Sequence, residues 1–278
     1  MFATAIIVFR EVLEASLIIG IVAAATHNVP GSRRWLAAGL LSGLAGSAVI
    51  AAFTDVIGSF ASGFGQELFN AGVLGIAVLM LAWHNIWMSS HGAALAASAR
   101  SVGGDIRDGR SECSVLLLIV GLAVLREGSE TVLFLYGIAA SESGRSSSML
   151  VGGVVGMTLG IAAGYMIYAG LLRLPLHWFF SATGVLVLLL AAGMASQAAR
   201  FLIQADMLPS LAAPLWDTSA VLPENGVTGM LLHSLIGYDS RPAGMQLVFY
   251  IIVLVTIGVG MKLAKSPRRS DSSTTGNI

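Results

Sequence analysis

Apolar runs of roughly 20 residues recur along the chain, with short polar breaks between them. They fall at residues 2–26, 36–58, 67–90, 114–140, 148–172, 177–203 and 244–263. A helix of this length crosses the hydrocarbon core of a bilayer. The pattern therefore predicts an all-α polytopic membrane protein with seven transmembrane helices.

We expect one transmembrane domain over residues 1–263. The only long polar break, residues 204–243, is predicted to be an outer loop. Within it, the apolar segment Val227–Ile236 is too short to cross a bilayer and is typical of an interfacial or re-entrant helix. The last helix covers residues 244–263, and the Ser/Thr-rich residues 264–278 are predicted to be a disordered cytoplasmic tail.

The composition excludes an ordinary soluble domain, because 56% of the 278 residues are hydrophobic and only 11% are charged. Cys113 is the single cysteine, which excludes a disulfide framework and a thiolate metal cluster within one chain. The formal net charge of zero by itself says nothing about partners, and we expect no nucleic-acid partner. The partner that the composition does imply is the lipid bilayer.

The distribution of charge predicts the orientation. With the N-terminus outside, ten of the fifteen Lys and Arg residues fall on the inner side and three on the outer side. Cytoplasmic loops carry the excess of Lys and Arg, so we expect the N-terminus outside and the C-terminus in the cytoplasm. Acidic residues show the opposite bias, which either concentrates cations at the outer mouth or merely accompanies the positive-inside pattern.

One five-residue pattern, Arg-Glu-x-x-Glu, occurs twice inside apolar runs. The first motif is Arg10–Glu14 and the second motif is Arg126–Glu130. On a helix the Arg and both Glu of each motif fall within about 100° of arc and project from one face. Ionised side chains are expensive in a membrane, so two such faces indicate a functional site.

The motif spacing suggests an internal repeat. Placing Arg10 on Arg126 also aligns Leu17 with Leu133. Repeat one covers about residues 1–91 and repeat two about residues 114–203. Because each repeat has three spans, the two must insert with opposite orientation, which predicts a 3+3 inverted repeat followed by one C-terminal helix. The motifs then meet near the membrane midplane.

The chemistry of the paired motifs favours a hard cation, since the site offers carboxylate oxygens and no thiolate. The alternative is a pair of packing ion pairs, Arg10 with Glu14 and Arg126 with Glu130, which leaves Glu11 and Glu127 unpaired. Four carboxylates and two guanidinium groups sum to −2. A divalent ion would bring the site to zero and Fe³⁺ to +1, so charge alone does not choose between them.

These residues carry a resemblance to a known family. The doubled motif on the first and fourth of seven helices resembles the oxidase-dependent high-affinity iron permease family. The stretches Gly193–Ala198 and Pro242–Leu247 are similar to its bacterial members. The resemblance implies a multi-pass protein of the bacterial inner membrane, with iron as the transported substrate and no organic cofactor. It also implies uptake as Fe³⁺, after a separate extracytoplasmic ferroxidase or peroxidase and an iron-delivery protein have supplied it.

The same resemblance assigns roles to the motif residues. It implies that the four glutamates bind the metal and that Arg10 and Arg126 tune the charge. The ligands implied are Glu11, Glu14, Glu127 and Glu130.

Two further groups are weaker candidates. Asp55 and Glu67 flank the second outer loop and are predicted to line an entrance vestibule, or else to cap helix ends. His84 and Met88 are predicted to form a secondary metal station near the inner exit. The alternative there is an aromatic belt at the interface with core methionines.

Two rival functions stay open from the sequence. One is a permease for another cation such as Mn²⁺ or Pb²⁺. The other is an intramembrane lipid pyrophosphate phosphatase, because Pro30–Arg33 faintly resembles a phosphate-binding turn, although repeat two has no counterpart. We favour transport and expect no enzymatic activity.

Overall fold

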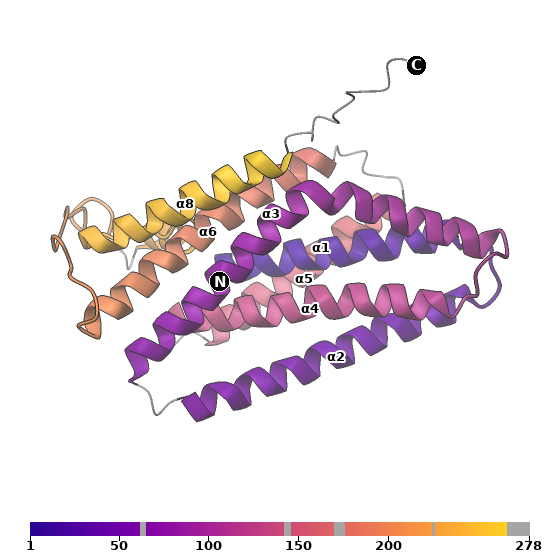
Figure 1. Ribbon diagram of the computed structural model, residues 1–278, viewed down its shortest axis with the longest axis horizontal. Helices are drawn as coiled ribbons and strands as arrows, with labels where there is room; N and C mark the ends of the chain where they lie inside the picture. The colour runs from indigo at the N-terminus through magenta and orange to yellow at the C-terminus, as the bar shows by residue number, and fades with distance from the viewer. Residues whose placement is uncertain (62–64, 142–145, 170–175, 224–225, 266–278) are drawn as a thin grey trace, which may run out of the picture.

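The computed structural model describes residues 1–61, 65–141, 146–169, 176–223 and 226–265. Over these residues the chain forms eight α-helices and no strand, which confirms the all-α prediction for the described part (Figure 1). The helices are α1 (Phe2–Ala25), α2 (Ser32–Ala61), α3 (Gln66–Arg107), α4 (Val115–Ser141), α5 (Ser146–Tyr168), α6 (Leu176–Gln204), α7 (Val227–Ile236) and α8 (Gly244–Lys265).

Helix α3 is much longer than predicted. It runs for 42 residues. The polar break expected directly after residue 90 is therefore wrong, because the chain stays helical up to Arg107. The segment 91–100 contains five alanines and no proline, a composition that favours continued helix. Ala99 and Ile106 bury against Val22 and Leu116. At 1.5 Å per residue the helix is about 63 Å long, about twice the hydrocarbon thickness of a bilayer.

Helices α1–α3, from the first half of the chain, pack mainly against helices α4–α6 from the second half. Helix α1 packs most extensively against α5, α2 against α4, and α3 against α6. Helices α1 and α4 also touch each other, and Figure 1 shows both near the middle of the bundle, with α2 and α8 at opposite edges. Each helix that carries a motif, α1 or α4, therefore packs against the second helix of the other half, α5 or α2.

Glycines on α2 and α5 allow this close packing. A Cβ atom on Gly43 of α2 would lie 2.6 Å from the Val124 Cβ of α4. A Cβ atom on Gly160 of α5 would lie 2.9 Å from the Val12 Cβ of α1. Any larger residue at either position must push a motif helix away.

Five of the described helices are long and apolar enough to cross a membrane, namely α2, α3, α5, α6 and α8. Helices α1 and α4 have 24 and 27 residues, so length does not exclude them. Each carries the three charged residues of one motif. These three charged residues, close together within one apolar stretch, distinguish α1 and α4 from the five helices named above.

The outer loop predicted at residues 204–243 contains the short helix α7. It has 10 residues and is capped at its C-terminus by Gly237, whose φ of 68° is a left-handed conformation that glycine adopts without strain. A Cβ atom on Gly193 of α6 would lie 2.7 Å from the Gly237 Cα. These two glycines let the end of α7 rest directly on α6.

Candidate metal site

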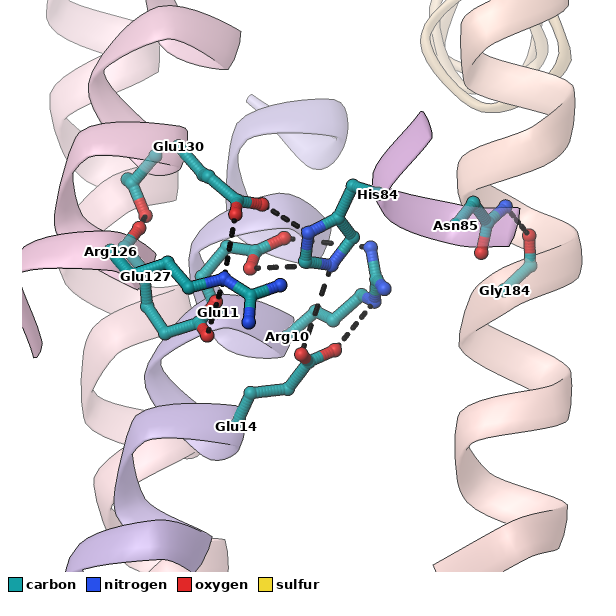
Figure 2. Close-up of polar contacts among 10 residues, drawn as sticks. Arg10, Glu11, Glu14, His84, Asn85, Arg126, Glu127, Glu130 and Gly184 are labelled. Carbon is teal, nitrogen blue, oxygen red and sulfur yellow. Dashed lines mark hydrogen bonds and ion pairs between the residues drawn. The ribbon is translucent and has the colours of Figure 1, made fainter. Parts of the chain in front are cut away.

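The two motifs lie beside each other on α1 and α4, and their acidic side chains converge (Figure 2). Glu11, Glu14 and Glu127 expose 1%, 2% and 3% of their surface, and the Glu130 side chain 14%. One carboxylate oxygen each from Glu11, Glu127 and Glu130 lie within 4.8 Å of one another. The structure thus gathers all four glutamates that the sequence singled out, named here the carboxylate cluster.

Each arginine pairs with the acids of its own motif. The Arg10 Nε lies 3.0 Å from a Glu14 oxygen, and an Arg10 terminal nitrogen lies 3.5 Å from a Glu11 oxygen. The Arg126 Nε donates to Glu130 at 3.2 Å and lies 3.9 Å from Glu127. The two guanidinium groups offset two of the four negative charges, as the motif arithmetic predicts.

His84 of α3 lies inside the carboxylate cluster and not at a separate station (Figure 2). Its Nε2 is 3.9 Å from a Glu11 oxygen and 3.7 Å from a Glu14 oxygen, and its Nδ1 contacts Glu130. Met88, which was grouped with it, lies one helical turn further along α3. The signal that points to this position is an ionisable residue, His84, well inside an apolar span.

Many polar atoms of the cluster are buried without a hydrogen-bond partner. Among the described residues these include five carboxylate oxygens, one or two from each of the four glutamates, and the Nε2 of His84. The close Arg10–Glu14 ion pair also lacks the angles of a hydrogen bond. Burying such groups without hydrogen bonds is costly, and a bound cation would satisfy several of them at once. The residues present therefore fit a metal ion held by oxygen ligands.

The site opens on the side of the second motif. The Arg126 side chain is 34% exposed, whereas Arg10 exposes only 2%. The Arg126 guanidinium carbon lies 4.3 Å from the centre of the Trp87 ring, and the His91 ring stacks on Trp87 with centroids 4.9 Å apart. The sequence gives no sign of the contact between Trp87 and Arg126, because nothing in the pattern joins α3 to α4.

Comparison with known proteins settles the family. The model of the iron permease FTR1 family matches residues 1–264. This chain belongs to that family. The resemblance inferred from the doubled motif is confirmed.

Relatives of the iron permease family match over nearly their full length. A ferrous iron permease EfeU of Escherichia coli O6:H1 (strain CFT073) is 30% identical, over 92% of this chain and 93% of the relative. The protein of the same name from Yersinia pestis is 28% identical, over 92% and 91% respectively. No solved structure matches the chain significantly. The bacterial relatives and the apolar helices place this permease in the inner membrane as a multi-pass protein.

Only one of the two predicted vestibule residues has a described side chain. Glu67 is exposed in the first turn of α3. Asp55 falls in α2, and its side chain lies outside the described residues. In the outer loop, Asp217 accepts hydrogen bonds from Ser219 and forms an ion pair with Arg241 at 3.0 Å. The Ser219 hydroxyl and amide, and then Arg241, lower the pKa of Asp217 to about 2, so it is charged throughout the physiological range.

The turn at Pro30–Arg33, which suggested a phosphatase, has a structural use. Ser32 is 2% exposed, and its hydroxyl donates to the Thr26 carbonyl at 3.0 Å. The Thr26 hydroxyl donates in turn to the Val22 carbonyl at 2.8 Å. The hydroxyl that a phosphate would need thus closes the connection between α1 and α2.

Proposed function

We propose that this chain is an iron uptake permease whose ion pathway passes through the carboxylate cluster. The observation that carries this proposal is the excess of buried carboxylate over buried counter-charge. Five buried oxygens lack a hydrogen-bond partner among the described residues, and two negative charges stay uncompensated by arginine. A buried charge without a partner is strongly destabilising, so a site of this kind is built for a cation.

The arrangement of helices supports two inverted repeats with the site between them. The exchange of partners, α1 with α5 and α4 with α2, is what an inverted three-helix repeat would produce. If α1 and α4 cross the membrane with the five apolar helices, the chain has seven spans, with its N-terminus outside by the distribution of Lys and Arg. Rocking of the repeats would then expose the cluster to each side in turn.

The form of the iron and its donor remain predictions. The family resemblance implies Fe³⁺ handed over by a ferroxidase or peroxidase system, whereas the relatives are named ferrous iron permeases. With neutral His84, Fe²⁺ would bring the cluster and its arginines to zero charge and Fe³⁺ to +1. The assay below therefore supplies both forms, together with Mn²⁺ and Pb²⁺.

The test is metal uptake into liposomes that contain the purified protein. Fe³⁺ would be held soluble by a weak chelator, and Fe²⁺ would be supplied without oxygen. Glu14→Gln and Glu130→Gln should each abolish uptake, because the amide keeps the shape of the side chain and loses its charge. The matched control is Glu112→Gln, an exposed glutamate that accepts a bond from Ser114 and lies outside the cluster.

Normal uptake by both cluster variants would show that the site is wrong. Uptake of Mn²⁺ or Pb²⁺ without iron would reassign the substrate while keeping the site. Equal loss in all three variants, control included, would indicate that neutralising any glutamate harms the protein and that the cluster has no special role.

A further inference from the structure

His84 is the one nitrogen-bearing aromatic side chain among the described residues that touches the carboxylate cluster. It exposes 3% of its surface, and both of its ring nitrogens lie close to carboxylate oxygens. It comes from α3, which carries no motif, so it is not required by the repeat of Arg-Glu-x-x-Glu. An imidazole buried among carboxylates needs a chemical reason.

The two ring nitrogens of His84 face different motifs. Nε2 lies 3.7 and 3.9 Å from oxygens of Glu14 and Glu11 in the first motif. Nδ1 contacts Glu130 of the second motif. A metal-binding histidine commonly coordinates through one nitrogen while its other N–H donates to a carboxylate, which fixes the tautomer and the ring. Here Glu130 is placed to receive the Nδ1 proton and Nε2 to bind an ion.

The ring is held in position by its neighbours on three helices. The Phe134 ring of α4 meets the His84 ring edge-on, with centroids 6.3 Å apart and planes at 82°. The next residue, Asn85, is 3% exposed and donates to the Gly184 carbonyl of α6 at 2.9 Å, which ties α3 to α6 at this level. The imidazole is thus presented to the cluster at a defined place and orientation.

We propose that His84 is a direct ligand of the transported ion, binding through Nε2 together with Glu11 and Glu14. One oxygen of each glutamate and a nitrogen of His84 lie within 4.8 Å of one another, as three ligands of one ion require. Glu130 then serves to orient the ring. This inference rests on the proposed function, because it assigns a further ligand to the same site.

The added nitrogen decides between divalent ions. Carboxylates alone suit Mn²⁺ and Ca²⁺, whereas imidazole suits iron, and affinity for Fe²⁺ exceeds that for Mn²⁺ at a given site. An imidazole within the cluster widens that difference. His84 is therefore the residue that gives the site its preference for Fe²⁺ over Mn²⁺.

The decisive experiment detects the metal–nitrogen bond and does not depend on transport. Mn²⁺ would be bound to purified protein in detergent, and pulsed electron paramagnetic resonance would measure coupling of the ion to ¹⁴N. Growth with ¹⁵N-histidine assigns the coupled nitrogen to histidine. We expect coupling in the wild type and in the control His27→Gln, whose ring is exposed and bonded to Asn28. The coupling should vanish in His84→Gln and His84→Asn.

The two substitutions also identify the ligating atom, since the Gln amide reaches about as far as Nε2 and the Asn amide about as far as Nδ1. We expect His84→Gln to keep Mn²⁺ binding better than His84→Asn. In anaerobic liposome uptake, His84→Gln should lower the preference for Fe²⁺ over Mn²⁺ by about tenfold or more, because even groups outside the ligand shell typically contribute about 10- to 100-fold in affinity.

Wild-type protein that takes up iron and shows no histidine nitrogen coupling would overturn this inference and leave the carboxylate site standing. Coupling that survives in both His84 variants would also overturn it. Wild-type protein that neither binds Mn²⁺ nor takes up any metal would overturn the proposed function as well.

Discussion

The two motifs have the same five-residue pattern and different surroundings. In the first motif Arg10 is 2% exposed and the Glu14 side chain is fully buried. In the second motif the side chains of Arg126 and Glu130, at the matching positions, are 34% and 14% exposed. Helix α1 is enclosed by contacts with α3, α4, α5 and α7, whereas Arg126 faces Trp87, whose ring stacks with the exposed His91.

This difference shows that a repeated sequence need not give two equivalent half-sites. The first motif forms the sealed wall of the cluster, and the second motif forms its accessible side. By the predicted orientation, Trp87 and His91 lie on the cytoplasmic side of the cluster. The conformation described here would then be closed toward the outside, where α7 rests on α6.

The largest expected effect separates the two arginines. Arg10→Ala should destabilise the protein by about 3–5 kcal/mol, because it leaves buried carboxylates without their counter-charge. Arg126→Ala should cost about 1 kcal/mol or less, because its partly exposed ion pairs are screened by solvent. Thermal unfolding of detergent-purified protein, followed by size-exclusion chromatography, measures both. Equal loss of stability would show that the two halves are alike in burial.

A second comparison tests the glycine contacts that hold the two motif helices. Gly43→Ala on α2 and Gly160→Ala on α5 should each destabilise the protein, since overpacking costs about 1–3 kcal/mol while alanine restores at most about 1 kcal/mol of helix propensity. The matched control is Gly153→Ala on α5, where an added Cβ meets no atom within 4 Å.

The same thermal measurement applies to the three glycine variants. We expect the Gly153 variant to be as stable as the wild type or slightly more so. If the Gly43 and Gly160 variants matched it, the tight packing of α2 on α4 and of α5 on α1 would be refuted.

The smallest expected effect concerns the accessible side. Trp87→Leu removes a cation–π contact with Arg126 worth about 0.5–1 kcal/mol, which corresponds to a change of about two- to fivefold in iron uptake at low concentration. Trp83→Leu is the control, because Trp83 on the same helix is 75% exposed. A larger loss for Trp83 than for Trp87 would contradict the role of the Trp87–Arg126 contact.

Much of the fold was readable from the sequence because it depends on local properties. Apolar runs predicted the start of α1 at its observed position and the end of α6 to within one residue, and the short apolar segment predicted α7. The end of α3 was missed, since Ala99 and Ile106 continue the helix by packing against Val22 and Leu116 from other elements. On α5 the sequence does not distinguish the neighbours Gly152 and Gly153, yet Gly153 faces open space and Gly152 makes the close contact.

The sequence by itself determined that the chain is a helical membrane protein with two charged motifs on facing helices, and it identified the family. Hydrophobic length and helical periodicity decide these features within single segments, because backbone hydrogen bonds in a membrane must be satisfied inside each helix. Only the tertiary structure decided that His84 joins the cluster, that Trp87 covers Arg126 and that the two motifs differ in exposure. These features depend on where separate helices cross. A crossing brings together side chains from different helices, and the spacing of residues along one helix does not predict which ones meet.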